Sequence, residues 1–292
     1  MKRRFLVFAA ALACSLTFAT VHAQEALNWV PMYEGVDVVT YEVAEPLMKV
    51  CAARIDVTAP GVEFKTTPPN EDFAPEERET TRQTTAMFLK DGGLAVAVNA
   101  NFYKPFNATT IATPGDANLT GLGVADGFVT SQPSPNNPSF VVTKSGEIDI
   151  RSFNAGDDLS DIQQAVSGNI VVLQDGEVLD LANKAVHPRT AIGYSQDKRF
   201  VYLMTIDGRQ QGHSIGASYK EVATELKKLG AYVGLNLDGG GSTTFVLRDA
   251  DNEPVVINRP CNSTKDRLRF NANAIGVKAN GAPKKAPTEL KF

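Results

Sequence analysis

The segment from residue 236 to 243, Asn-Leu-Asp-Gly-Gly-Gly-Ser-Thr, places a carboxylate beside three glycines and two hydroxyls. Asn236 and Asp238 alternate with leucines, so both polar side chains should share one face of a strand whose other face is buried. Consecutive glycines let backbone N–H groups point together at an anion. A solvated glycine-rich turn is the alternative, but the acid and hydroxyls at a strand end favour a ligand site. The candidate anion-binding residues are Gly240, Gly241, Ser242 and Thr243.

Two arginines flank a second pair of predicted strands. Arg189 follows His187-Pro188 and precedes an apolar strand, and Arg209 closes Asp207-Gly208-Arg209 after the next strand. The planar guanidinium fork of arginine suits a phosphate group, because it donates two parallel hydrogen bonds. A surface salt bridge is the usual alternative for each arginine. We favour the ligand site for Arg189 and leave Arg209 open.

Asn99 and Asn101 follow the buried run Leu94 to Val98 and should point to the same side. They could orient sugar hydroxyls or a water, or they could cap turns by bonding to the backbone. His213 lies in a glycine-containing loop, where it could act as an acid or base or simply be solvated.

These residues require a sheet that brings strand ends together. Apolar, β-branched runs predict strands over 36–41, 49–57, 94–98 and 232–237, and turn dipeptides between residues 121 and 176 favour antiparallel hairpins. A short helix is expected over 80–90. The clearest helix is 218–229, with a capping box at Ser218 and Glu221 and a stop at Gly230. We therefore predict an α+β fold, a single domain with a mostly antiparallel mixed sheet, a crossover helix near 218–229 and a few flanking helices.

The first 23 residues have the pattern of a signal peptide. Lys2, Arg3 and Arg4 precede an apolar stretch, and Val21-His22-Ala23 suits cleavage near Ala23. We expect a periplasmic or secreted protein, a catalytic domain over 24–278 and a flexible tail over 279–292. Removal of the leader takes the formal charge from −4 to −7, which argues against nucleic acid as a partner. No membrane span is expected after cleavage.

Cysteine and histidine usage gives little sign of a metal centre. Cys51 and Cys261 remain after cleavage and could form one disulfide or stay separate thiols. No Cys or His pair has zinc-site spacing. We expect no required cofactor or metal, although the oxygen ligands of Asp238, Asp207 and Asn236 could hold calcium or magnesium.

The order of motifs resembles the phosphodiester glycosidase family, which includes the mammalian uncovering enzyme of the mannose 6-phosphate pathway. The likeness covers about residues 90 to 278. It departs from the commoner pattern at Ala100, where many relatives have glycine, and at residues 252–261. The motifs that carry it are Asn99-Ala-Asn-Phe-Tyr103, Ser167-Gly168, Arg189-Thr-Ala-Ile-Gly193, Asp207-Gly-Arg209, Gly216-x-Ser218-x-x-Glu221, Asn236-Leu-Asp-Gly-Gly-Gly-Ser242 and Arg267.

The resemblance implies a hydrolase that releases a sugar from a sugar-1-phosphodiester and leaves a phosphomonoester, as N-acetylglucosamine-1-phosphodiester alpha-N-acetylglucosaminidase does. Its substrate would be a small-molecule or glycan phosphodiester. Under this interpretation Asp238 acts as base or nucleophile with Asp207 as helper, and Arg189 and Arg267 hold the phosphate. A glycan-binding protein without activity, or an exopolysaccharide glycosidase without phosphate in its substrate, are the alternatives. The natural sugar and the oligomeric state stay open.

Overall fold

The computed structural model describes residues 27–107, 109–261 and 268–292. The signal-peptide prediction and Arg267 lie outside these residues. An eight-stranded sheet forms the base of the molecule, and every strand pairing within it is antiparallel. In spatial order its strands are β1 (Val30–Tyr33), β2 (Val36–Val43), β3 (Met48–Asp56), β17 (Phe200–Ile206), β16 (Arg189–Tyr194), β18 (Val233–Asn236), β14 (Ile170–Gln174) and β15 (Glu177–Val178).

Three smaller antiparallel sheets complete the β-structure. One contains β20 (Pro254–Val256), β19 (Phe245–Arg248), β6 (Val96–Asn99), β21 (Ala274–Lys278) and β4 (Glu63–Thr66). The next contains β10 (Phe128–Ser131), β9 (Gly123–Ala125), β13 (Ile162–Ser167), β11 (Ser139–Thr143) and β12 (Ile148–Arg151). The smallest contains β5 (Thr80–Arg82), β8 (Gly115–Leu119) and β7 (Tyr103–Lys104).

Helices are few. The described chain has two α-helices, α1 (Thr85–Gly92) and α2 (Tyr219–Leu229), and three 3₁₀ turns, η1 (Thr110–Ala112), η2 (Gly240–Ser242) and η3 (Pro287–Leu290). Thr84 caps the start of α1 by accepting a hydrogen bond from the Met87 N–H, and left-handed Gly93 ends it. The start of α2 has the predicted capping box of Ser218 and Glu221, and left-handed Gly230 follows its end.

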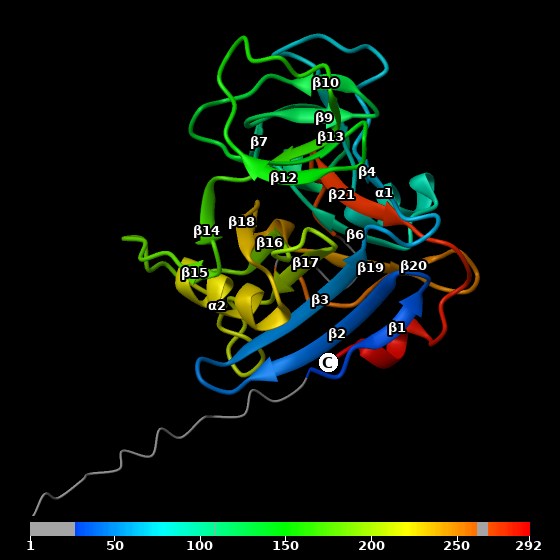
Figure 1. Cartoon of the computed structure of the whole chain (residues 1–292), viewed down its shortest axis with the longest axis vertical. Helices are drawn as coiled ribbons and strands as arrows, with labels where there is room; N and C mark the ends of the chain where they lie inside the picture. Colours follow the sequence, from blue (N-terminus) through cyan, green and yellow to red (C-terminus); the bar gives the residue numbers. More distant parts are fainter. Residues whose placement is uncertain (1–26, 108, 262–267) are drawn as a thin grey trace, which may run out of the picture.

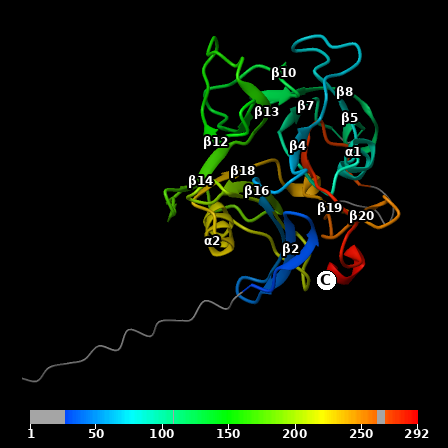
Figure 2. The same cartoon turned by 45° about the vertical axis from the view of Figure 1, so that its right-hand side comes forward.

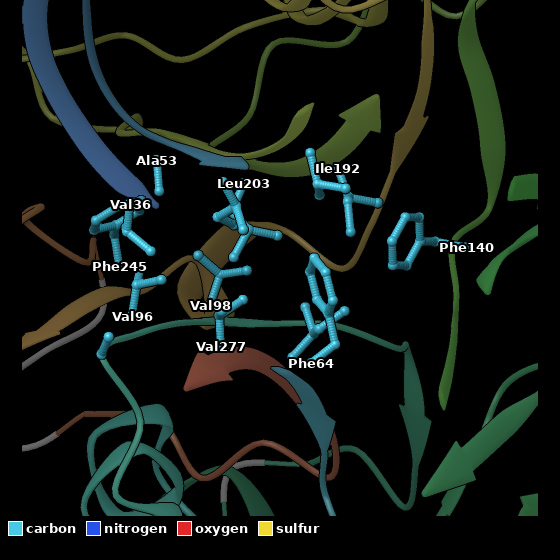
Figure 3. Packing of buried hydrophobic residues seen from close by; sticks show 14 of the residues in the cluster. Val36, Ala53, Phe64, Val96, Val98, Phe140, Ile192, Leu203, Phe245 and Val277 are labelled. Carbon is cyan, nitrogen blue, oxygen red and sulfur yellow. The ribbon is translucent and has the colours of Figure 1, made fainter. Parts of the chain in front are cut away.

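The main core lies between the eight-stranded sheet and the sheet that contains β6. Figure 3 shows Leu203 and Ile192 of the first sheet facing Val98 and Val277 of the second. Successive residues of a strand point to opposite faces, and Met204 accordingly packs on the other face, in the cluster that includes α2 residues. Both faces of the large sheet are therefore covered, which explains its nearly continuous apolar strands.

Each α-helix covers an outer face of this sandwich. Val222 and Leu226 of α2 pack on the large sheet, and Phe88 and Leu89 of α1 pack on Ala97 of β6 and its neighbours. Figures 1 and 2 show the two helices on opposite sides of the molecule. The helix α2 links β17 to β18, and β16 lies between these two strands and is antiparallel to both. The predicted crossover unit is thus present.

The predicted α+β fold class is wrong. The described part of the chain is mostly β, with 41% of its residues in strands and 11% helical, and the sheets are antiparallel rather than mixed. The prediction included a few flanking helices, whereas a second sheet covers one face of the large sheet. The predicted helix over 80–90 is also shorter, because Thr80–Arg82 pairs with β8 as β5.

The C-terminal segment contacts the rest of the domain, and the flexible tail expected over 279–292 stays a prediction. The Lys284 N–H donates to the Met32 carbonyl at 2.8 Å. Leu290 in η3 is 7% exposed and belongs to the main core. Cys51 is a buried free thiol on β3, so it forms no disulfide with Cys261.

Candidate active site

Three of the predicted site residues meet at one edge of the large sheet. In the register of β16 and β17, Arg189 lies opposite Ile206, the residue before Asp207. In the register of β16 and β18, Ala191 lies opposite Asn236. The start of β16 therefore lies beside the ends of both neighbours, because antiparallel strands bring opposite ends together.

A cleft of about 780 Å³ lies over this edge. Among the described residues that line the cleft, Asp238 is the one carboxylate. Three arginines, a lysine and a histidine line it as well. This excess of positive charge suits an anionic ligand. The lining residues are Phe102, Tyr103, Lys104, Phe106, Thr120, Asn169, His187, Pro188, Arg189, Arg209, Tyr219, Asp238, Gly239, Gly240, Gly241 and Arg269.

Asp238 is fixed at the floor of the cleft by its own backbone. Its N–H donates to the Ala100 carbonyl at 2.9 Å, and its carbonyl accepts a hydrogen bond from Asn99 Nδ2 at 2.6 Å. Burial of the Asp238 carboxyl raises its pKa to about 6, although a hydrogen bond from Ser242 and the charge of Arg269 oppose the shift. Such a group is a carboxylate at neutral pH and still close enough to titration to accept a proton.

The glycines after Asp238 let the chain turn against β16. A Cβ atom at Gly239 would lie 2.5 Å from the Pro188 carbonyl oxygen, and Gly240 has a φ of +61°. The N–H of Gly240 donates to that same oxygen at 2.9 Å. This N–H therefore holds the turn in place. The phosphate-binding role predicted for it and for Gly241 stays a prediction.

One side of the cleft carries two arginines and a histidine. Arg189 is 6% exposed; its Nε and Nη2 donate to the carbonyls of Ala217 and Ala185 at 2.9 and 2.7 Å, and its guanidinium lies 4.4 Å from the centre of the Tyr219 ring. Burial lowers the pKa of Arg189, but arginine keeps its charge in proteins. No carboxylate in the described part of the chain forms an ion pair with it. Its charge is therefore available to a ligand.

Arg209 and His187 extend this positive side. The Nη2 of Arg209 lies 3.2 Å from His187 Nδ1. Burial and the neighbouring arginines lower the pKa of His187, so the histidine is neutral at pH 7 and can accept a hydrogen bond from Arg209. The Arg209 N–H donates to the Ile215 carbonyl at 3.1 Å. The structure thus brings Arg209, which the sequence left open, into the cleft beside Gly240.

Asp207 and His213 lie together but do not line the cleft. Asp207 is 1% exposed, and its carboxylate accepts hydrogen bonds from His213 Nε2 at 2.8 Å, Asn258 Nδ2 at 2.9 Å and the Arg259 N–H at 2.9 Å. Burial raises its pKa against these bonds. This arrangement supports a role in holding the turn that presents Arg209 rather than direct contact with a ligand.

The three predicted asparagines are buried within the protein. Asn101 is 1% exposed, and its amide bonds to the Ser167 N–H, Asn273 and the Thr120 and Leu122 carbonyls. Asn99 is also 1% exposed and bonds to protein groups. Asn236 donates to Asn169 Oδ1 at 2.8 Å, and Asn169 lines the cleft. Their placement favours structural support over contact with substrate.

Ser242 and Thr243 are buried behind the glycines. Ser242 Oγ accepts a hydrogen bond from Arg269 Nη1 at 3.3 Å, and Thr243 Oγ1 has no hydrogen-bond partner among the described atoms.

Sequence reasoning missed Arg269 and the aromatic residues of the cleft. Arg269, Asn271 and Asn273 alternate before β21, and the last two bond to Ser242 and Asn101. That alternation could have indicated Arg269 as a residue on the same side.

The described residues contain no group of three or more His, Cys, Asp or Glu side chains that could hold a metal ion. The absence of a metal requirement stays a prediction, and activity after chelation tests it.

Comparisons with known proteins show what the chain is similar to. The model of a family described as phosphodiester glycosidase matches residues 92–278. A search of curated proteins gives no match. The catalytic domain of zebrafish N-acetylglucosamine-1-phosphodiester alpha-N-acetylglucosaminidase, auto-inhibited by its pro-peptide, is similar in fold, with a TM-score of 0.60, 18% identity, and coverage of 87% of this chain and 85% of that chain. A hypothetical protein from Synechocystis has a TM-score of 0.57 and 16% identity over 87% of this chain and 64% of that chain.

Proposed function

Because the chain belongs to the phosphodiester glycosidase family, we propose that its cleft hydrolyses sugar-1-phosphodiesters and releases the free sugar and a phosphomonoester. The observation that carries the proposal is the excess of positive charge in the cleft. Among its described lining residues, Asp238 is the one carboxylate, and Lys104, Arg189, Arg209 and Arg269 are cationic. A phosphodiester supplies the negative charge that this surface lacks.

The positive side of the cleft binds the phosphate in this proposal. Arg189 is immobilised by two carbonyls and by Tyr219, so it loses little conformational freedom when it binds an anion. Arg209 reaches the same region beside Gly240. Preorganised donors of this kind stabilise charge that develops on a leaving group, typically by about 3 kcal/mol each.

Asp238 activates the water. Its carboxylate accepts a proton from water while the water oxygen bonds to the anomeric carbon. The bond between that carbon and the phosphate oxygen breaks, and its electron pair leaves with the phosphomonoester. Glycosidases that expel an alcohol need a second carboxyl group as acid. A phosphate is a far better leaving group, which is consistent with Asp207 lying away from the cleft.

The test is incubation of the purified protein with UDP-N-acetylglucosamine and with a methyl phosphodiester of the same sugar, followed by quantification of free sugar and phosphomonoester. Asp238→Asn keeps the shape of the side chain and should lower kcat by at least about 10³-fold. Asp91→Asn, at an exposed aspartate near the end of α1, is the matched control and should leave kcat unchanged. Tight glycan binding without turnover of any diester by the wild type would reject the proposal.

We also propose that the protein is exported to the periplasm or beyond, on the basis of its basic, apolar N-terminal sequence. None of the helices in the described residues is long and apolar enough to cross a membrane.

A further inference from the structure

Three aromatic residues of one chain segment, Phe102, Tyr103 and Phe106, line the cleft and form what we call its aromatic wall. We propose that this aromatic wall binds the apolar face of the sugar ring, with Phe106 as the stacking surface that determines affinity for the sugar. The inference rests on the proposed function and assigns the two sides of the cleft to the two parts of the substrate.

Phe106 is unusually exposed for its type. Its 57% exposure is the highest among the exposed large hydrophobic residues of the described chain, and the residue lines the cleft. A solvent-exposed phenyl ring gives up the free energy that its burial would contribute. Aromatic side chains that line a cleft together with a few charged groups are typical of ligand sites.

The ring of Phe106 is held in place although it is exposed. Tyr103 contacts it edge to face, with 5.8 Å between ring centres, and the Arg269 guanidinium lies 5.1 Å from its centre on the ring face. Tyr103 is itself fixed, because its hydroxyl donates to the Phe270 carbonyl at 2.8 Å. Phe106 is thus preorganised and would lose little conformational freedom when a ligand stacks on it.

Arg269 connects the aromatic wall to the reacting group. Its Nη1 donates to Ser242 Oγ at 3.3 Å, and Ser242 in turn hydrogen bonds to the Asp238 carboxyl. The anomeric carbon must lie beside Asp238 and the phosphate beside Arg189 and Arg209. The rest of the sugar ring, which contains this carbon, then extends away from the phosphate and towards Phe106.

A pyranose suits this wall chemically. One face of the ring presents C–H groups, which pack on an aromatic surface and release water from both. Lys104 follows Tyr103 in the chain, and the Thr120 N–H donates to the Phe102 carbonyl at 2.7 Å; both residues line the cleft and can bond to the hydroxyls at the ring edge. The aromatic wall therefore supplies apolar contact, and its polar neighbours supply orientation.

The test compares Phe106→Ala and Phe106→Leu with Phe128→Ala. Phe128 is 46% exposed on β10 and does not line the cleft, so it is the matched control. Each variant is assayed with N-acetylglucosamine phosphodiesters that carry a methyl or a uridylyl group, and KM and kcat are measured separately. We expect Phe106→Ala to raise KM about tenfold for both substrates, with kcat within about twofold of the wild type. Phe106→Leu should give a smaller increase, and Phe128→Ala none.

Three outcomes would overturn the inference. An unchanged KM in Phe106→Ala would show that the ring is not used. A KM that rises only for the uridylyl substrate would assign the aromatic wall to the leaving group. An equal rise of KM in Phe128→Ala would show that the effect is not specific to the cleft.

Binding of methyl α-glycosides, which contain no phosphate, separates this inference from the proposed function. Wild-type binding that Phe106→Ala weakens about tenfold supports the aromatic wall even if no diester is hydrolysed. Diester hydrolysis that is indifferent to Phe106 would retain the proposed function and reject the aromatic wall.

Discussion

Removal of the Asn99 amide should weaken both the fold and the site. Asn99 Nδ2 donates to the Asp238 carbonyl, and Asn99 Oδ1 accepts hydrogen bonds from Thr190 Oγ1 at 2.7 Å and the Thr244 N–H at 3.2 Å. Asn99 ends β6, Thr190 belongs to β16, Asp238 follows β18 and Thr244 precedes β19. This single amide therefore joins the ends of four strands. Asn99→Ala removes all three bonds at once.

The magnitude follows from the donors left without an acceptor. A buried donor that loses its partner costs about 1–3 kcal/mol, so the Thr190 hydroxyl and the Thr244 N–H together predict about 2–6 kcal/mol. Water that enters the vacated space recovers part of this, and we expect the free energy of unfolding to fall by about 3 kcal/mol. That is a large share of the roughly 5–15 kcal/mol that stabilises most proteins.

Guanidinium denaturation followed by circular dichroism measures the loss, and kcat measured on the folded variant should fall because the Asp238 carbonyl loses its hydrogen bond from Asn99. Asn154→Ala, at an exposed asparagine, is the control and should change stability by less than about 0.5 kcal/mol. A loss below about 1 kcal/mol with unchanged kcat would refute the assignment of Asn99 as the residue that joins these strands.

Three further predictions test the charges and the packing. Because the pKa of Asp238 is raised from 3.8 to about 6 and its carboxylate acts as the base, kcat/KM should increase as pH rises to about 6 and level off above it; a decrease above pH 6 would make Asp238 an acid. The same shift favours the protonated carboxyl in the fold, so its contribution to stability is present below pH 4 and is lost as pH rises through 6. Arg189→Lys should lower kcat/KM by about 10²-fold, whereas Arg199→Lys, at an exposed arginine paired with Asp56, should not change it. Leu290→Ala should lower the free energy of unfolding by about 2–3 kcal/mol, while Lys291→Ala should have little effect, and equal stability of both would contradict the packing of the C-terminal segment.

The sequence predicted local features of the site better than it predicted which elements pack on the faces of the large sheet. The capping box at Ser218, the strand that leads to Asp238 and the position of Arg189 at the start of β16 are all properties of neighbouring residues, and the structure contains each of them. The sandwich depends on contacts between residues far apart, such as Leu203 with the sheet containing Val98, and apolar runs alone do not tell whether a helix or a sheet covers a strand.

The same distinction explains the errors within the site. Asp207 and Asp238 both follow strands, and alternation could not show that Asp207 turns into a network with His213 and Asn258. Phe106 and Arg269 meet only because two loops separated by more than 150 residues line one cleft. Spacing along the chain carries no signal for such a pair.

Hydrolysis in H₂¹⁸O tests the central claim most directly, because it identifies the bond that breaks. The substrate is N-acetylglucosamine joined to methyl phosphate, and mass spectrometry of both products follows the label at early times, before the free sugar exchanges its anomeric oxygen. Attack at the anomeric carbon predicts ¹⁸O in the sugar and unlabelled methyl phosphate. Label in the methyl phosphate would show attack at phosphorus and would contradict a glycosidase mechanism centred on Asp238.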